Sequence, residues 1–306
     1  MISVAEIKKL QKLPLQELSA LALEQKLANR GQQVSLCSII NAKSGKCSED
    51  CRFCTQSAHY NTDSPVYPLK NRQEVLAAAA EAKQIGATRF SLVTSGRGMN
   101  HEQVEPIAEL VATIREEVGI KVCASLGILG VKELTTLKDA GVSRYHHNLE
   151  TSKEFFHQVV SSHTFADRIN TIKACQEAGL EVCAGGIFGL GESEDDRISM
   201  ALSLRELKVD SVPINILIPL PGTPLANLAA IPIAEVLRSI ALYRLIHPQL
   251  PIRLAGGRES MLNDLLGTAF MAGIDGMMIG GYLTQRGRSP EEDSRFVAEI
   301  QQIWTS

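Results

Sequence analysis

The sequence predicts a (β/α)8 TIM-type barrel with a helical extension at its amino end. Eight times, a short apolar run of strand length is followed by a loop and then by a segment with the apolar period of an amphipathic helix. Alternating strands and helices form a parallel sheet, and eight such units in roughly 270 residues are typical of a closed barrel. No G-x-G-x-x-G segment follows the first strand, so the barrel is favoured over a doubly wound sheet.

The predicted elements follow one another in a regular order. A helix is expected over 3–28, because leucines recur on one face and Asn29-Arg30-Gly31 ends the pattern. Strands are expected at 33–40, 88–94, 121–127, 143–149, 181–188, 211–218, 251–257 and 276–282. Helices are expected at 71–86, 102–118, 131–140, 165–179, 193–206, 232–247, 259–272 and 290–304. We expect one domain over 1–306, with 1–30 as a helical cap and 33–306 as the barrel.

Composition excludes several classes of protein. The 306 residues are 44% hydrophobic and 21% charged, which is ordinary for a globular enzyme. The net charge of −3 provides no basic field for nucleic acid, and no apolar run is long enough to span a membrane. The amino end lacks the apolar core of a signal peptide, so we expect a cytoplasmic protein, or an organellar one whose targeting segment is absent. Seven cysteines in such a chain indicate reduced thiols or metal ligands.

Three cysteines lie within eight residues, directly after the first predicted strand. Cys47, Cys51 and Cys54 have the spacing C-x3-C-x2-C, and thiolates this close favour a soft-metal centre. A zinc site that includes His59 is one alternative, and a thioredoxin-like C-x2-C is another. Three thiolates also suit a four-iron cluster with one iron left open. The loop lies at the carboxyl ends of the strands, where the active sites of such barrels lie.

Four further residues are expected to face the barrel interior. Cys37, Cys123, Cys183 and Arg253 lie on the first, third, fifth and seventh predicted strands. Alternate strands contribute side chains to the same interior layer, so these four residues are expected to ring one level. A single buried cysteine is usually a small core residue, as we expect for Cys175. Arg253, however, requires a negative partner inside a barrel, and an anionic iron–sulfur cluster would supply one.

The segment K-S-G-K-C-S-E-D-C-R-F-C-T-Q-S carries a resemblance to a known family. Its cysteines, with Phe53 before the last of them, resemble the signature of radical S-adenosylmethionine (SAM) enzymes, and the longer match resembles the biotin synthase family. The resemblance implies that Cys47, Cys51 and Cys54 hold a [4Fe-4S] cluster whose open iron binds SAM, beside Phe53. It implies conversion of dethiobiotin to biotin, an electron donor such as flavodoxin or ferredoxin, supply by the iron–sulfur assembly machinery, and a homodimer.

The same resemblance implies an auxiliary iron–sulfur cluster, usually [2Fe-2S], as the source of sulfur. Family members hold it with three cysteines and an arginine, which this chain matches at Cys123, Cys183 and Arg253. Ser91 stands where the family usually has a cysteine, and Cys37 stands where it usually has a serine. We therefore hypothesise that Cys37 supplies the missing ligand. Three thiolates around an open iron would equally suit a four-iron cluster that carries a labile sulfide.

Family resemblance also extends to residues expected near SAM and substrate. In H-H-N-L-E-T-S, Asn148 is expected to contact the SAM ribose or the substrate, and Glu150 replaces the usual aspartate as the ribose ligand. His146 replaces an asparagine near the substrate, and Arg168 is expected to pair with the SAM carboxylate.

Two later segments complete the match. In G-G-I-F-G-L-G-E, Ile187 and Gly189 are expected against adenine, because glycine lets backbone approach a flat ring. In V-P-I-N, Asn215 is expected to bind the ureido ring of dethiobiotin, since an amide offers both a donor and an acceptor.

The resemblance implies radical chemistry in two rounds. The loop cluster passes an electron to SAM, a 5′-deoxyadenosyl radical removes hydrogen from dethiobiotin, and the substrate radical takes sulfur from the auxiliary cluster. Two alternatives remain open: another radical SAM enzyme of the same subgroup, such as a lyase, mutase or maturase, and a non-catalytic zinc- or iron-binding barrel.

Overall fold

The computed structural model describes residues 2–280 and 288–305. Its sheet holds nine parallel strands in the order β5-β4-β3-β2-β1-β9-β8-β7-β6. The strands are β1 Ser35–Lys43, β2 Arg89–Thr94, β3 Lys121–Ser125, β4 Val142–His146, β5 Glu181–Cys183, β6 Gly186–Phe188, β7 Val212–Ile216, β8 Ile252–Leu254 and β9 Gly276–Met278. Each of them overlaps a predicted strand, and β1 extends three residues beyond its predicted end. Residues 281 and 282 of the last predicted strand lie outside the described residues.

The two ends of this strand order meet in one chain segment. Strands β5 and β6 are halves of the single strand predicted over 181–188, and only Ala184 and Gly185 separate them. The Leu149 amide donates to Gly185 O at 2.9 Å on one side, and the Ala184 amide donates to Ser211 O at 3.0 Å on the other. A Cβ on Gly185 would lie 1.9 Å from the carbonyl oxygen of Pro213, so glycine permits this close approach. The sheet therefore closes on itself, and the predicted (β/α)8 barrel is confirmed.

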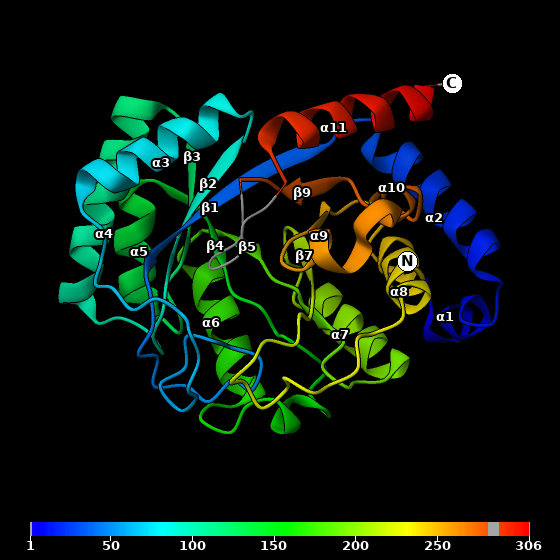
Figure 1. Ribbon diagram of the computed structural model, residues 1–306, viewed down its shortest axis with the longest axis horizontal. Helices are drawn as coiled ribbons and strands as arrows, with labels where there is room; N and C mark the ends of the chain where they lie inside the picture. The colour runs from blue at the N-terminus through cyan, green and yellow to red at the C-terminus, as the bar shows by residue number, and fades with distance from the viewer. Residues whose placement is uncertain (1, 281–287, 306) are drawn as a thin grey trace.

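Helices surround the strands (Figure 1). They are α1 Val4–Leu10, α2 Leu15–Arg30, α3 Arg72–Gln84, α4 His101–Thr113, α5 Val131–Ala140, α6 Phe165–Glu177, α7 Glu194–Glu206, α8 Ile233–Ile246, α9 Arg258–Leu262, α10 Leu266–Met271 and α11 Pro290–Thr305. Six of them begin with a capping box, in which the side chains of the residue before the helix and of the third residue in its first turn accept hydrogen bonds from each other's backbone amides. The capping residues are Ser3, Asn71, Asn100, Thr164, Ser193 and Ser289.

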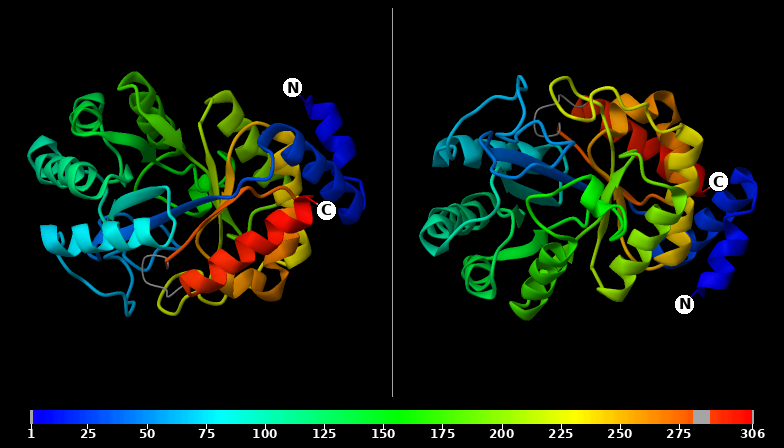
Figure 2. Two further views of the ribbon diagram at one scale, coloured as in Figure 1. Left: turned by 90° about the horizontal axis from the view of Figure 1, so that it is seen from above. Right: turned by 90° about the horizontal axis from the view of Figure 1, so that it is seen from below.

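The prediction of one helix over 3–28 is wrong. Two helices, α1 and α2, occupy this segment, and Pro14 caps the second. Proline has no amide hydrogen to continue the first helix, but it is well tolerated at the start of the next. Helix α2 packs against α8, and both termini lie on this side of the molecule (Figure 2). The extension therefore packs on α8 and α10, the helices that precede and follow β8 in the chain.

Two other predicted helices are interrupted. The helix expected over 102–118 ends in a π-helical turn, Ile114–Val118, and the one expected over 259–272 divides into α9, a 3₁₀ turn at Asn263–Leu265, and α10. Asn263 has a φ of 45°, which an α-helix does not accommodate. A further 3₁₀ turn, Phe156–Gln158, was not predicted. The single-domain assignment stays a prediction.

The described helices include none with both the length and the apolar character needed to cross a membrane.

Candidate active site

One cavity runs inside the barrel from the carboxyl ends of the strands toward the interior. Cys47, Cys51, Phe53 and Cys54 of the loop after β1 line its mouth. Cys37, Cys123, Cys183 and Arg253 line the same cavity from within the strands. The two cysteine sets predicted from sequence therefore face one space.

Strand register shows how the interior set is arranged. A barrel with eight strands and a shear of 8 shifts by about one residue per strand, so members of one layer on alternate strands are about two residues out of register. Cys37 on β1 pairs with Arg89 on β2, which pairs with Lys121 on β3. Lys121 lies two residues before Cys123. Cys123 in turn pairs with Arg144 on β4, which pairs with Glu181 on β5, two residues before Cys183.

The same step continues around the barrel. Cys183 forms a parallel bridge with Ser211. Ser211 lies two residues before Pro213, the residue of β7 that pairs with Arg253. Arg253 pairs with Gly276 on β9, which pairs with Ser35 on β1, two residues before Cys37. The same step therefore returns to the starting strand. The four residues thus form one interior layer, as predicted from alternate strands. We call this set, Cys37, Cys123, Cys183 and Arg253, the thiol layer.

Layers of side chains lie directly above and below the thiol layer. Ser91 pairs through Cys123 with Arg144, so the same two-residue step places Ser91 level with His146, nearer the mouth. The step also places Arg89 level with Arg144, nearer the amino ends of the strands. Ser91 is therefore one layer nearer the mouth than Cys37, and the hypothesis that Cys37 supplies the ligand missing at Ser91 stays a prediction.

Charges and unpaired polar atoms in the cavity fit an anionic group. The described lining contains four arginines, Arg89, Arg144, Arg168 and Arg253, but only one carboxylate, Glu150. Burial lowers the pKa of Arg253, but the neighbouring thiols of Cys37, Cys183 and Cys123 reverse this and raise it above its usual range. Within the described part of the chain, Arg253 Nε, Arg144 Nη1 and Ser91 Oγ are buried without a hydrogen-bond partner. An iron–sulfur cluster bound by thiolates would supply acceptors for the two guanidinium donors.

Backbone hydrogen bonds shape the cysteine loop at the mouth. The amide of Cys47 donates to Gln56 O at 3.0 Å, and that of Cys54 donates to Cys51 O at 2.9 Å. Burial, with a contribution from the nearby Cys47 thiol, raises the pKa of the Cys54 thiol to about 11. Bound iron would supply the positive charge that keeps such a buried thiol deprotonated.

No three His, Cys, Asp or Glu side chains of residues 2–280 and 288–305 are arranged to hold a single metal ion. His59 is not among the residues that line the cavity, and its Nε2 lies 2.9 Å from the carbonyl oxygen of Ser48.

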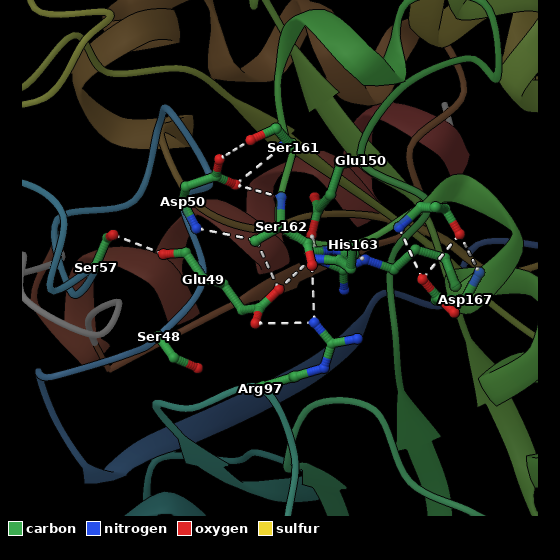
Figure 3. A network of polar contacts seen from close by, with 12 residues as sticks. Ser48, Glu49, Asp50, Ser57, Arg97, Glu150, Ser161, Ser162, His163 and Asp167 are labelled. Atoms are coloured by element: carbon green, nitrogen blue, oxygen red, sulfur yellow. Dashed lines mark hydrogen bonds and ion pairs between the residues drawn. The ribbon is translucent and has the colours of Figure 1, made fainter.

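The acidic residues of the cysteine motif tether the loop to the segment before α6 (Figure 3). The Asp50 carboxylate accepts hydrogen bonds from the amides of Ser161 and Ser162 at 3.0 and 2.9 Å. Glu49 accepts from Ser162 Oγ at 2.8 Å and lies 2.5 Å from His163 Nδ1. The motif therefore carries its own anchoring groups beside its cysteines.

His163 connects this anchor to the cavity. Arg168 Nε donates to His163 Nε2 at 3.0 Å, and arginine can only donate, so Nε2 accepts and Nδ1 carries the proton given to Glu49. Burial and Arg168 lower the pKa of His163, which agrees with a neutral ring. Arg168 Nη2 then lies 3.9 Å from the Glu150 carboxylate inside the cavity. A continuous chain of polar contacts thus orients Arg168.

Glu150 and Asn148 lie together at the end of β4. Asn148 Nδ2 donates to Glu150 Oε2 at 3.2 Å, and Asn148 Oδ1 accepts from the Gly185 amide at 3.1 Å. Glu150 has a φ of 68°, a left-handed conformation that is uncommon for a side chain of this size. Burial raises the pKa of Glu150, while Arg168 acts in the opposite direction. This constrained, buried carboxylate is well placed to accept hydrogen bonds from a hydroxylated ligand.

Three predicted ligand contacts lie outside the described cavity lining. Ile187 belongs to β6, and the Gly189 amide, at a φ of 95°, donates to Glu192 Oε1 at 2.9 Å. Asn215 joins β6 to the turn after β8, because Nδ2 donates to Gly186 O and Oδ1 accepts from the Gly256 amide. Their contacts with adenine and the ureido ring stay predictions. Cys175 is buried in α6 among core residues, which confirms its expected core position.

Sequence reasoning missed several residues of the site. Arg89 and Arg144 precede Ser91 and His146 by two residues on the same strands, so strand alternation alone could have identified them as inward-facing. His163 and Arg97 give no such signal. Arg97 Nη1 donates to Ser162 O at 2.8 Å and lies 3.4 Å from Glu49, a contact that only the folded chain reveals.

Comparisons with known proteins agree with this geometry. The family model of the radical SAM superfamily matches residues 42–219, and that of the biotin and thiamin synthesis associated domain matches residues 213–301. The first match contains the cysteine loop, Cys123 and Cys183, and the second contains Arg253, whereas Cys37 lies before both.

Individual proteins give a narrower result. A biotin synthase of Pelotomaculum thermopropionicum is 50% identical over 286 residues, which cover 94% of this chain and 89% of that protein. A biotin synthase of Acetivibrio thermocellus is 47% identical over 302 residues, 98% of this chain and 94% of that protein. The crystal structure of methylornithine synthase shares the fold, with a TM-score of 0.80 at 20% identity over 98% of this chain and 93% of that one. The chain belongs to the biotin synthase family within the radical SAM superfamily.

Proposed function

We propose that this chain inserts sulfur into dethiobiotin to form biotin, as a radical SAM sulfurtransferase. One observation carries the proposal: the three-cysteine loop and the thiol layer line a single cavity, at its mouth and in its interior. A reaction that needs a radical source and a sulfur source requires both to reach one substrate. The names of the relatives and the radical SAM match support the same reaction.

Cys47, Cys51 and Cys54 would hold a [4Fe-4S] cluster with SAM at its open iron. When bound, the cluster and SAM supply a radical able to remove hydrogen from an unactivated carbon, chemistry that side chains lack. Arg168, oriented by His163, would pair with the SAM carboxylate, and Glu150 with Asn148 would accept from and orient its ribose. Ile187 and Gly189 would lie against its adenine.

Cys37, Cys123, Cys183 and Arg253 would hold the auxiliary iron–sulfur cluster that provides sulfur. A [2Fe-2S] cluster is usual in the family, but three thiols in one layer also suit a four-iron type. Cys37 would replace the ligand that Ser91 cannot supply. His146, in the layer between the thiols and the mouth, would face the substrate, and Asn215 would bind the ureido ring.

The barrel wall positions the reacting groups. Parallel strands fix the height of the thiol layer below the mouth. A substrate held between the two cysteine sets would therefore have the radical source on one side and the sulfur source on the other. Enclosure also keeps water from a reactive substrate radical. Electron supply from flavodoxin or ferredoxin, cluster supply by the assembly machinery, a homodimer and a cytoplasmic location are part of the proposal.

The test is an anaerobic incubation of iron- and sulfide-reconstituted protein with SAM, dethiobiotin and a reductant, analysed by mass spectrometry. Biotin together with 5′-deoxyadenosine is expected, and a Cys51→Ala protein should give neither. 5′-Deoxyadenosine without biotin would move the assignment to another radical SAM reaction. Absence of both products, from protein with intact cluster absorbance, would contradict the proposal as a whole.

A further inference from the structure

Arg144 lies directly beneath the thiol layer. It belongs to β4, is 7% exposed, and pairs in register with Cys123 on one side and Glu181 on the other. Its layer also holds Arg89, so two guanidiniums underlie the interior cysteines. Neither Arg89 nor Arg144 is among the site residues that the family resemblance implied.

Only part of the Arg144 guanidinium is satisfied by protein. Nε and Nη2 bond one oxygen of Glu181 at 2.9 and 2.8 Å, and Arg89 Nη2 bonds the same oxygen at 2.9 Å. Arg144 Nη1 is buried, has no partner among the described residues, and belongs to a residue that lines the cavity. A charged donor buried without an acceptor is costly, so an acceptor bound in the cavity would stabilise it.

The local charge also remains unbalanced. Arg89 and Arg144 share the single carboxylate of Glu181, whose side chain is 44% exposed. Arg253 adds a third positive charge one layer higher, and Glu150 near the mouth is the only carboxylate of the described lining. Arg89 Nη1 lies 4.0 Å from the Cys123 sulfur, and Arg144 pairs with Cys123 in register, so both arginines lie close to that thiol. The base of the cavity is therefore built for an anion with more than one hydrogen-bond acceptor.

We propose that Arg144 donates through Nη1 to the anionic iron–sulfur group held at the thiol layer, as a second guanidinium contact besides Arg253. The inference rests on the proposed auxiliary cluster and extends it. Glu181 holds the guanidinium by its other edge and so fixes the direction of Nη1. The sulfides and thiolates of such a cluster are the acceptors that the unpaired donor lacks.

A contact of this kind affects the redox behaviour of the cluster. One-electron reduction adds a negative charge, which a nearby guanidinium stabilises in a buried site of low dielectric. Arg144→Gln removes that charge while Arg89 keeps its bond to Glu181. The reduction potential of the auxiliary cluster should therefore become more negative. If Arg144 only linked β4 to β5 through Glu181, its substitution would leave the reduction potential of the auxiliary cluster unchanged.

The experiment compares full-length reconstituted wild-type protein with Arg144→Gln and Arg144→Lys. The matched control is Arg72→Gln, which removes an exposed arginine paired with Glu117 on the surface. Iron and sulfide contents are measured first. A redox titration monitored by EPR follows. The signal that changes on addition of SAM is assigned to the loop cluster. The other signal is assigned to the auxiliary cluster and gives its reduction potential.

We expect Arg144→Gln to retain the auxiliary iron with a more negative potential, Arg144→Lys to show a smaller shift in the same direction, and Arg72→Gln to match the wild type. An unchanged potential at full iron content in Arg144→Gln and Arg144→Lys would overturn the proposal and leave the proposed function intact. Should Arg144→Gln fail to fold, Arg144→Lys decides by the same criterion. Wild-type protein with no iron beyond the loop cluster would instead contradict the proposed function, and this inference with it.

Discussion

The mouth and the interior of the cavity bring cysteines together in opposite ways. Cys47, Cys51 and Cys54 are neighbours in sequence, and a loop tethered by side chains gives them their arrangement. The interior thiols of Cys37, Cys123 and Cys183 belong to three different strands, and only strand register makes them one layer. The loop site should therefore depend on a few side-chain contacts, whereas the thiol layer should depend on the barrel as a whole.

The largest expected effect separates the two regions by function. Cys51→Ala should reduce 5′-deoxyadenosine formation to background, because the loop cluster loses one of three thiolates. Cys123→Ala should retain SAM cleavage but lose biotin formation, because only the sulfur source is affected. Both products are quantified by mass spectrometry after anaerobic turnover. Wild-type SAM cleavage by Cys51→Ala would contradict the assignment of the mouth.

The next effect tests the thiol layer itself. Cys37→Ala should lose most of the auxiliary iron and sulfide, because register places this thiol level with Cys123 and Cys183. Iron and sulfide are counted after reconstitution. Cys175→Ala is the matched control, since it removes a buried thiol from α6, outside the cavity. Unchanged auxiliary iron in Cys37→Ala would refute the hypothesis that the ligand moved from the position of Ser91.

A smaller effect is expected at the tether of the mouth. His163→Ala removes the acceptor that orients Arg168 and the partner of Glu49, so SAM affinity should fall about tenfold, as for other outer residues that orient metal-site ligands. The measurement is the dissociation constant of SAM from its effect on the loop-cluster EPR signal. His163→Gln, which can both accept and donate, should retain more affinity, and the exposed His157→Ala should match the wild type. Equal affinity in all of these proteins would show that Arg168 needs no such support.

The smallest effect concerns the layer between the two regions. Burial, opposed by Glu150 and assisted by Arg253, lowers the pKa of His146 to about 4. The unfolded chain, with an ordinary histidine pKa near 6.5, then binds more protons than the folded chain between these values, so stability falls as pH decreases through this range. For cluster-free protein, His146 should contribute a loss of about 1 kcal/mol in unfolding free energy between pH 7.5 and 5.5.

Urea unfolding of wild-type and His146→Asn protein at both pH values measures this contribution. The variant should lose less stability on acidification, because asparagine does not titrate. Identical pH dependence in the two proteins would mean that His146 is not held neutral in the interior.

Much of the site could be predicted because its signals are local. The spacing of Cys47, Cys51 and Cys54 lies in one stretch of chain, and strand alternation identified Cys37, Cys123, Cys183 and Arg253 as inward-facing. The break at Pro14 was equally visible, yet the leucine pattern on both sides of it favoured a single helix. Here a local rule, the missing amide hydrogen of proline, prevailed over periodicity.

By itself, the sequence determined the barrel class, the cysteine loop and the set of inward-facing thiols, because two-residue and 3.6-residue periods are properties of neighbouring residues. Only the tertiary structure decided that Ala184 and Gly185 join the two edges of the sheet, that His163 lies between Glu49 and Arg168, and that Arg144 lies beneath the thiols. These outcomes depend on the register of strands and loops distant in sequence. Because the shear of a closed barrel is a property of all its strands together, no single segment encodes which side chains share a layer.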